Sequence, residues 1–215
     1  MSFAAFDKLL ELRSPPLVDE LRLYLANGDR AWADPEKLAR RKRVSMPYWA
    51  VAWAGGIVLA RYVLDHPGLF ARKHVVDFAS GSGLVALACA KVGARSVTAV
   101  DIDRVAAQAI AANARANGLH VQVDTSDWLS LDNRVADFVL AGDACYDRVE
   151  AVPIVKWLRL QAAYGADVLL GDSHRPWAPR TQIAVVAELS HLTEKQTDDD
   201  TLARARVLRL VARPG

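Results

Sequence analysis

The chain has 215 residues, of which 52% are hydrophobic and 24% are charged, and its formal net charge is +2 at pH 7. This composition predicts one globular domain with a full hydrophobic core, and the nearly balanced charge argues against a nucleic-acid partner. No apolar run is long enough to cross a membrane, and residues 1–12 include acids and lack a basic start, so we expect no membrane association, no secretory signal and a cytoplasmic location.

Residues 1–73 are predicted to form an N-terminal helical extension that packs on a site in the rest of the chain or covers it as a lid. Pro15-Pro16 separates two helical segments, and a third begins where Asp34 supplies an N-cap. The aromatic residues of this region predict either a substrate platform or packing against a sheet. The expected helices are Phe3–Leu12, Leu17–Leu25 and a segment from Asp34, and the aromatic residues are Trp32, Tyr48, Trp49 and Trp53.

Strands and helices alternate through residues 74–215, which are predicted to form the main domain. This order is typical of an α/β, Rossmann-like fold, with a doubly wound, mainly parallel seven-stranded sheet and an antiparallel hairpin at its C-terminal edge. The expected strands are His74–Phe78, Ser96–Val100, Leu119–Val123, Ala136–Ala141, Ala166–Leu170, Ser190–Gln196 and Ala205–Val211, and the expected helices are Leu84–Val92, Arg104–Asn117, Val152–Ala163 and Thr181–Glu188.

A glycine turn at Asp77–Gly83 joins the first of these strands to a helix and reads Asp-Phe-Ala-Ser-Gly-Ser-Gly. Glycine allows a tight reversal and lets the backbone approach a ligand that a β-carbon would exclude. The helix after the turn presents free N–H groups and the positive end of its dipole, which suit a carboxylate or a phosphate. The turn therefore predicts a nucleotide-type ligand, and both NAD and S-adenosylmethionine (SAM) fit it.

Two acids help to separate these ligands. Asp101 ends the second strand, 101 − 81 = 20 residues after Gly81, where an acid can bind the ribose hydroxyls that both ligands carry. Asp77 lies just before the turn, where a carboxylate would repel a pyrophosphate but attract the ammonium and sulfonium groups of SAM. We therefore favour SAM over NAD.

Polar residues also follow the later strands, and the carboxyl ends of the strands in an open α/β sheet face one crevice. After the third strand, an acid at Asp127 can accept from an adenine amine, and Trp128 can cover the ring. Other interpretations are a local turn at Asp127 and core packing of Trp128. Asp103 and Asp147 are expected to cap helices, and Asp172 to form an ion pair with Arg175.

These motifs resemble the seven-β-strand, SAM-dependent methyltransferases and, more narrowly, the lysine methyltransferases of the electron transfer flavoprotein β-subunit. The resemblance runs over roughly the whole chain. One departure is Ala79, because relatives often have glycine at this place. The matching segments are Arg13–Val18, Pro47–Gly56, Asp77–Gly83, Asp101–Asp103, Gly142–Asp147 and Gly171–Pro176.

The resemblance implies a SAM-dependent protein-lysine N-methyltransferase that releases S-adenosylhomocysteine, with the electron transfer flavoprotein β-subunit as its protein substrate. The implied catalytic residues are Asp143, which would orient the amine, and Tyr146, which would close the channel. Trp49 and Trp53 would form walls of the acceptor pocket, where an aromatic ring attracts a methylated ammonium. The implied cofactor-binding residues are Trp53, Asp77, Ser80, Gly81, Gly83, Asp101, Ile102, Asp127 and Trp128.

Other functions remain open from the residues alone. The same chemistry could act on another protein, such as a ribosomal protein, or on a small amine. An NAD-dependent oxidoreductase is disfavoured by Asp77 and by the lack of a second catalytic domain, and a silent binding module by the presence of Asp143 and Tyr146. The histidines and the two cysteines, Cys89 and Cys145, lack metal-ligand spacing, so we expect reduced thiols and no metal.

Overall fold

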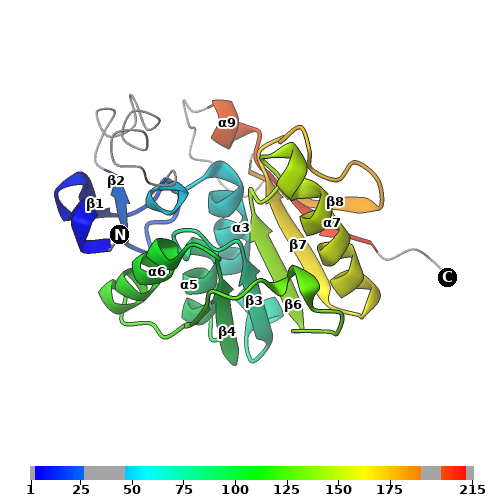
Figure 1. Cartoon of the computed structure of the whole chain (residues 1–215), viewed down its shortest axis with the longest axis horizontal. Helices are drawn as coiled ribbons and strands as arrows, with labels where there is room; N and C mark the ends of the chain where they lie inside the picture. The colour runs from blue at the N-terminus through cyan, green and yellow to red at the C-terminus, as the bar shows by residue number, and fades with distance from the viewer. Residues whose placement is uncertain (1–2, 27–46, 190–199, 212–215) are drawn as a thin grey trace.

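A computed structural model describes residues 3–26, 47–189 and 200–211. Its centre is a seven-stranded sheet in the order β5-β4-β3-β6-β7-β9-β8 (Figure 1). The strands from β5 to β7 in that order are parallel, and β9 is antiparallel to both of its neighbours, which confirms the predicted fold class. The strands are β3 His74–Phe78, β4 Ser96–Val100, β5 Gln122–Asp124, β6 Phe138–Gly142, β7 Asp167–Asp172, β8 Ile183–Glu188 and β9 Arg206–Leu210.

Helices cover both faces of the sheet (Figure 1). Residues of α3, α5 and α6 share one hydrophobic core with the sheet, whereas α7 shares a second core with its other face. Neighbouring residues of a strand point to opposite faces, so Val75 lies in the first core and Val76 in the second. The helices are α3 Ala54–Asp65, α4 Pro67–Phe70, α5 Leu84–Lys91, α6 Arg104–Ala116, α7 Arg148–Ala163 and α9 Asp200–Ala203, with 3-10 turns η1 Phe3–Leu9, η2 Tyr48–Ala50 and η3 Trp128–Ser130.

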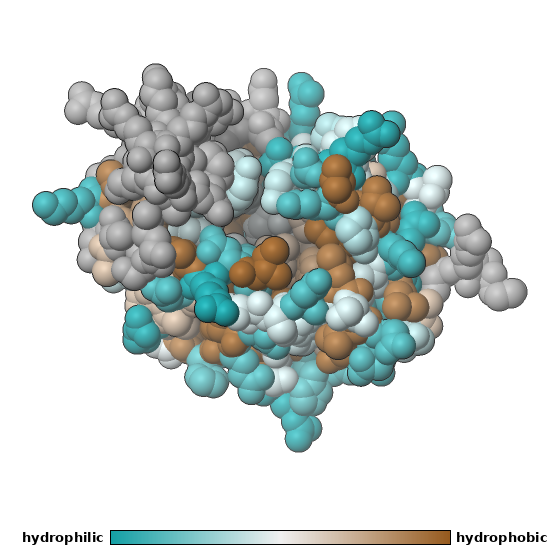
Figure 2. Space-filling model, in the orientation of Figure 1, coloured by the Kyte–Doolittle hydropathy of each residue, from teal (hydrophilic) through white to brown (hydrophobic). Residues whose placement is uncertain are grey.

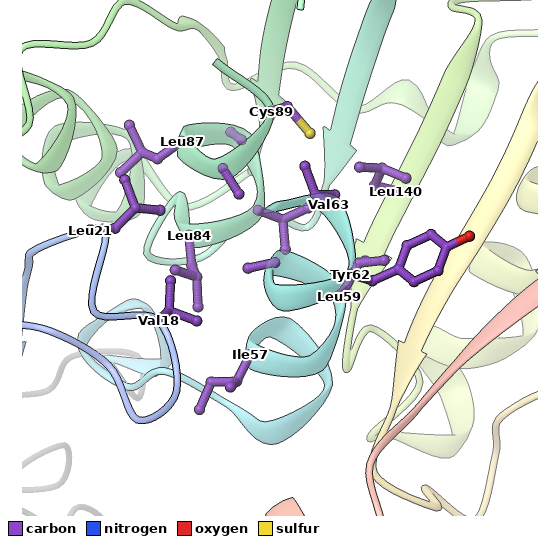
Figure 3. Close-up of a cluster of buried hydrophobic side chains, with 14 of the residues drawn as sticks. Val18, Leu21, Ile57, Leu59, Tyr62, Val63, Leu84, Leu87, Cys89 and Leu140 are labelled. Carbon is purple, nitrogen blue, oxygen red and sulfur yellow. The ribbon is translucent and has the colours of Figure 1, made fainter. Parts of the chain in front are cut away.

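Helix α3 precedes the first strand of the sheet but packs deeply against it. Figure 3 shows its side chains in one cluster with those of α5 and of the N-terminal segment. This packing brings the start of α3 to the carboxyl ends of β6 and β7, where the candidate site lies. The side chains labelled around α3 are Val18, Leu21, Ile57, Leu59, Tyr62, Val63, Leu84, Leu87, Cys89 and Leu140.

The N-terminal segment differs from the predicted helices. Its 3-10 turn η1 is followed by β1 (Leu10–Arg13), which pairs antiparallel with β2 (Leu23–Ala26), so the helix predicted over Leu17–Leu25 is wrong. Leu21, Leu23 and Leu25 are buried while the residues between them are more exposed, which is the two-residue period of a strand. The helix expected from Asp34 lies outside the described residues.

Asn113 fastens this segment to the glycine turn. Its fully buried side chain accepts from the Tyr24 backbone at 2.8 Å and donates to the Ser82 carbonyl at 2.8 Å. Because one amide satisfies groups of both segments, β2 and the turn are held in a fixed relation.

The other correction concerns the far edge of the sheet. Thr181–Glu188 was expected to be helical, but Ile183–Glu188 forms β8 and pairs antiparallel with β9. The edge hairpin is therefore confirmed with a different first strand, because the expected strand Ser190–Gln196 falls outside the described residues. No helix in the described ranges has the length and apolar character needed to cross a membrane.

Candidate functional site

The glycine turn between β3 and α5 has three residues in the left-handed region. Their φ angles are 54° at Ala79, 55° at Gly81 and 82° at Gly83, which is the N-cap of α5. Glycine accepts this conformation without strain, whereas a β-carbon makes it costly. At Ala79 the structure thus requires the conformation for which the family often uses glycine. At Gly83 an added β-carbon would also meet Ile110 at 3.1 Å.

Asp77 lies at the end of β3 and is only 1% exposed. Its Oδ2 accepts from the Ser80 hydroxyl at 2.6 Å and from the Ala86 backbone at 3.0 Å. No hydrogen bond among the described residues uses Oδ1. The pKa of Asp77 is raised to about 7, mainly because the carboxyl group is buried. The two hydrogen bonds lower the pKa but do not offset the effect of burial. A cation beside Oδ1 would restore the ionised form.

Asp101 ends β4 and bridges to the same turn. Its Oδ2 accepts from the Gly81 backbone at 2.8 Å, and its Oδ1 from the Asp103 backbone at 2.9 Å. Burial raises the pKa of Asp101, and the two backbone donors oppose that shift. Next to it, Ile102 is 75% exposed, so an apolar side chain is available to a flat ring. Asp103 caps α6 as predicted, accepting from the Val105 backbone.

Asp127 and Trp128 lie after β5, at the start of η3. Asp127 is exposed and accepts from the Leu129 backbone at 2.9 Å, which uses one carboxylate oxygen as a local cap. Trp128 is partly buried and donates its indole N–H to Asp124 at 3.0 Å. Sequence reasoning missed Asp124, which ends β5 and also accepts from the Ser126 backbone and hydroxyl. Asp124 fixes the orientation of the ring that was predicted to cover an adenine.

Asp143 follows β6 and is 6% exposed, with a strained φ of 51°. Its Oδ2 accepts from the Gly55 backbone, so a carboxylate from the sheet caps the N-terminus of α3. Its Oδ1 accepts from the Ser173 hydroxyl at 2.6 Å and from Arg175 Nε at 2.9 Å. The ion pair predicted from the sequence between Asp172 and Arg175 is therefore wrong, because the Arg175 side chain pairs with Asp143. Asp172 pairs instead with Arg206 at 3.0 Å.

An aromatic group lies beside this carboxylate and consists of Tyr48, Trp53 and Tyr146. The ring centroids of Tyr48 lie 5.3 Å from Tyr146 and 6.1 Å from Trp53, and the Arg175 guanidinium carbon lies 5.5 Å from the Trp53 ring centroid. All three rings are partly exposed. Burial and a hydrogen bond to Glu150 raise the pKa of the Tyr146 phenol, so it stays protonated at neutral pH.

Trp49 does not belong to this group. It is 2% exposed and packs on Phe3 and Phe6 with ring centroids at 5.6 and 5.2 Å, so the expectation that it forms a wall of the pocket is wrong.

Glycines make the approach of α3 to the sheet possible. A β-carbon on Gly171 would lie 2.0 Å from the Gly55 carbonyl oxygen, and one on Gly142 would lie 2.8 Å from the Gly56 α-carbon. Sequence reasoning noted Gly142 and Gly171 only as members of motifs and did not predict this contact. It also missed Ser173 as a partner of Asp143, although both lie in segments that the family resemblance marks.

Several known proteins are similar to this chain. The family model described as Ribosomal protein L11 methyltransferase (PrmA) matches residues 62–142. The electron transfer flavoprotein beta subunit lysine methyltransferase of Rattus norvegicus is 36% identical over 76% of this chain and 66% of its own length. The protein of the same name from Mus musculus is 40% identical over 61% of this chain and 52% of its own length. The chain thus spans about half to two thirds of these curated relatives.

Solved structures share the fold at lower identity. Magnesium protoporphyrin IX methyltransferase from Synechocystis PCC 6803, with bound SAM, has a TM-score of 0.54 at 16% identity. The match covers 74% of this chain and 80% of that chain. The 16S rRNA N2 G1207 methyltransferase of T. thermophilus has a TM-score of 0.52 at 19% identity, and the match covers 74% of this chain and 43% of that chain. At these identities the likeness concerns the fold alone.

The electron transfer flavoprotein beta subunit lysine methyltransferase of Xenopus laevis is 31% identical over 89% of this chain and 77% of its own length. The chain therefore belongs to the electron transfer flavoprotein beta subunit lysine methyltransferase family.

Proposed function

We propose that the protein transfers methyl groups from SAM to lysine side chains of the electron transfer flavoprotein β-subunit, in the cytoplasm. The observation that carries the proposal is the pair of acids on the two sides of the glycine turn, the buried Asp77 and the half-buried Asp101. Family membership supports the acceptor and the reaction.

The acids and the turn fit the parts of SAM. Oδ1 of Asp77, which accepts no hydrogen bond from the described residues, would accept from the ammonium of the methionine part. Asp101, already held by Gly81, would accept from the ribose hydroxyls. Ile102 would pack on the adenine. The cofactor brings an activated methyl group, so the protein's task is to position and desolvate the acceptor.

The acceptor side has two tasks, because a lysine amine has a pKa of about 10.4 and arrives protonated. The aromatic group would surround the amine in partly apolar walls, which favours loss of its proton to water. Asp143 would orient the amine through its remaining lone pair. Tyr146, whose pKa is raised, would act as a neutral hydrogen-bonding wall and not as the base.

A protein acceptor is favoured over a small amine by the surface beside Tyr146. Val149 and Val152 in the first turns of α7 are exposed, and Figure 2 shows hydrophobic side chains over the upper part of that helix. Exposed apolar side chains next to a site are typical of a surface that another protein covers. A ribosomal protein is a second candidate acceptor, favoured by the match of residues 62–142 to the L11 methyltransferase model.

The test is methyl transfer from radiolabelled SAM into a protein extract of the source organism, resolved by size. One labelled band that matches the flavoprotein β-subunit supports the proposal, whereas another band would replace the acceptor and keep the chemistry. Failure to bind SAM in a calorimeter would overturn the cofactor and reopen NAD.

Changing Asp77 to Asn is expected to stabilise the ligand-free protein and to weaken SAM binding. The folded pKa of about 7 lies above the ordinary 3.8, so between these values the folded state holds a proton that the unfolded state has lost. The folded state therefore loses stability as pH rises through this window, by about 4 kcal/mol at pH 8, and Asn removes that loss.

Calorimetric titration with SAM and thermal melts, both at pH 6, 7 and 8, check this expectation. Wild-type affinity should rise with pH because the ionised Asp77 attracts the cation, and Asp77→Asn should weaken binding about tenfold and flatten the dependence. Any titration of SAM itself is common to both proteins. Parallel pH profiles for the two would show that Asp77 does not face the ligand.

A further inference from the structure

A cavity of about 300 Å³ lies at the carboxyl end of β7 and is called the basic pocket here. Four of its six lining residues are basic: His174, Arg175, Arg180 and Arg206. The other two, Ala178 and Ile183, are apolar. The proposed mechanism gives this cavity no role.

The charges of the basic pocket do not cancel. Arg175 is neutralised by Asp143 at 2.9 Å, and Arg206 by Asp172 at 3.0 Å. Arg180 is exposed, and no carboxylate in the described part of the chain pairs with it. Among the described residues, the pocket thus keeps one guanidinium without a paired carboxylate, flanked by two others, and this arrangement suits one anionic group.

The loop that forms the basic pocket is held in place by hydrogen bonds to Asp172 and Arg159. The Arg175 backbone donates to Asp172 at 2.9 Å, and Arg159 of α7 donates to the Gln182 side chain at 2.7 Å and to the Thr181 carbonyl at 3.1 Å. His174 and Gln182 have φ angles of 61° and 54°, so the loop holds two strained residues. Strain that the surroundings maintain is frequent where a loop binds a ligand.

Arg175 joins the basic pocket to the acceptor site. Its Nε donates to Asp143, its guanidinium lies over Trp53, and the same side chain lines the pocket. An anion in the pocket would therefore lie one guanidinium away from the carboxylate that orients the amine.

We propose that the basic pocket binds the carboxylate of an acidic side chain that lies close in sequence to the target lysine of the protein substrate. This inference rests on the proposed function, because it assigns the pocket to the same substrate. A lysine at Asp143 and an acid at Arg180 would fix the substrate segment at two points, one on each side of Arg175.

The test compares methylation of the purified flavoprotein β-subunit by the wild type, Arg180→Glu and Arg95→Glu. Arg95 is an exposed arginine just before β4, which lies next to the edge strand β5 and is separated from β7 by β3 and β6, and Arg95→Glu makes the same charge change. We expect Arg180→Glu to raise the KM for the protein substrate at least about tenfold with a smaller effect on kcat, and Arg95→Glu to match the wild type. If the charge reversal in Arg180→Glu impairs folding, Arg180→Gln replaces it in the comparison, and we expect a smaller rise in the KM for the protein substrate.

A charge swap on the substrate identifies the bound group. Each acid near the methylated lysine is changed to lysine in turn. One such change should raise the KM of the wild-type enzyme and lower that of Arg180→Glu. Equal KM values for the wild type and both Arg180 variants, or no substrate acid that shows the reciprocal effect, would overturn the inference.

Failure of the proposed function would look different from failure of this inference. It would appear in the wild-type enzyme, as absence of methylation of the β-subunit. The same comparison of variants would then use the extract protein that the wild type labels.

Discussion

Changing Asp143 to Asn is expected to lower kcat for methyl transfer by about 10²–10³-fold, the loss typical when one fixed electrostatic partner is removed from an active site. Both oxygens of Asp143 accept hydrogen bonds, Oδ2 from Gly55 and Oδ1 from Ser173 and Arg175. An amide must turn its NH2 group toward one of these donors, so at least one hydrogen bond breaks. The substitution also leaves the Arg175 guanidinium without its counter-charge. The amine that Asp143 would orient then meets a neutral amide.

Single-turnover methylation and calorimetric SAM binding separate the effect on chemistry from an effect on the cofactor. The affinity for SAM should change less than about threefold, because Asp143 lies on the acceptor side. Asp147→Asn is the matched control: it caps α7 with Oδ1 alone, accepting from Val149 and Glu150, and an amide oxygen can replace it. A kcat for Asp143→Asn close to that of Asp147→Asn would remove Asp143 from the mechanism.

The parallel part of the fold was predictable because its signals are local. β3 and β4 begin and end at the predicted residues, since a short apolar run followed by a glycine turn or an acid marks a buried parallel strand. The mainly parallel, doubly wound sheet followed from the alternation of strands and helices. The positions of Asp77 and Asp101 beside the turn followed from the same spacing.

The antiparallel strands were harder to predict because distant partners decide them. Ile183–Glu188 has a mixed burial pattern and becomes a strand through pairing with β9, which lies later in the chain. β2 likewise pairs with β1, although a helix is predicted from the sequence over Leu17–Leu25. Short apolar segments fit both periods, so tertiary pairing decides between them.

The partners of the site acids were predictable only in part. The cap formed by Asp103 depends on residues two positions away and was foreseen. The bond between Asp143 and Arg175 joins residues 32 positions apart, and the bond between Asp143 and Gly55 joins residues 88 positions apart. Such contacts depend on where the loops after β6 and β7 meet the start of α3, which no local pattern specifies.

The close approach of α3 to the sheet leads to the second large effect, on stability. Gly55→Ala is expected to lower the free energy of unfolding by about 1–3 kcal/mol, the usual cost of overpacking. The new β-carbon would lie 2.4 Å from the Gly171 carbonyl oxygen and 2.8 Å from the Asp143 carboxylate. Because the Gly171 oxygen belongs to the backbone of a central strand, α3 must move away.

Gly56→Ala tests the same substitution one residue later in the same helix. A β-carbon on Gly56 meets nothing within 4 Å, so alanine should leave stability unchanged or raise it by up to about 1 kcal/mol through its higher helix propensity. Urea unfolding of both variants measures the difference, and methylation assays well below the melting temperature show whether displacement of Gly55 also disturbs Asp143. Equal stability of the two variants would mean that α3 can shift on the sheet without cost, and the acceptor site would then be built on a movable helix instead of a fixed one.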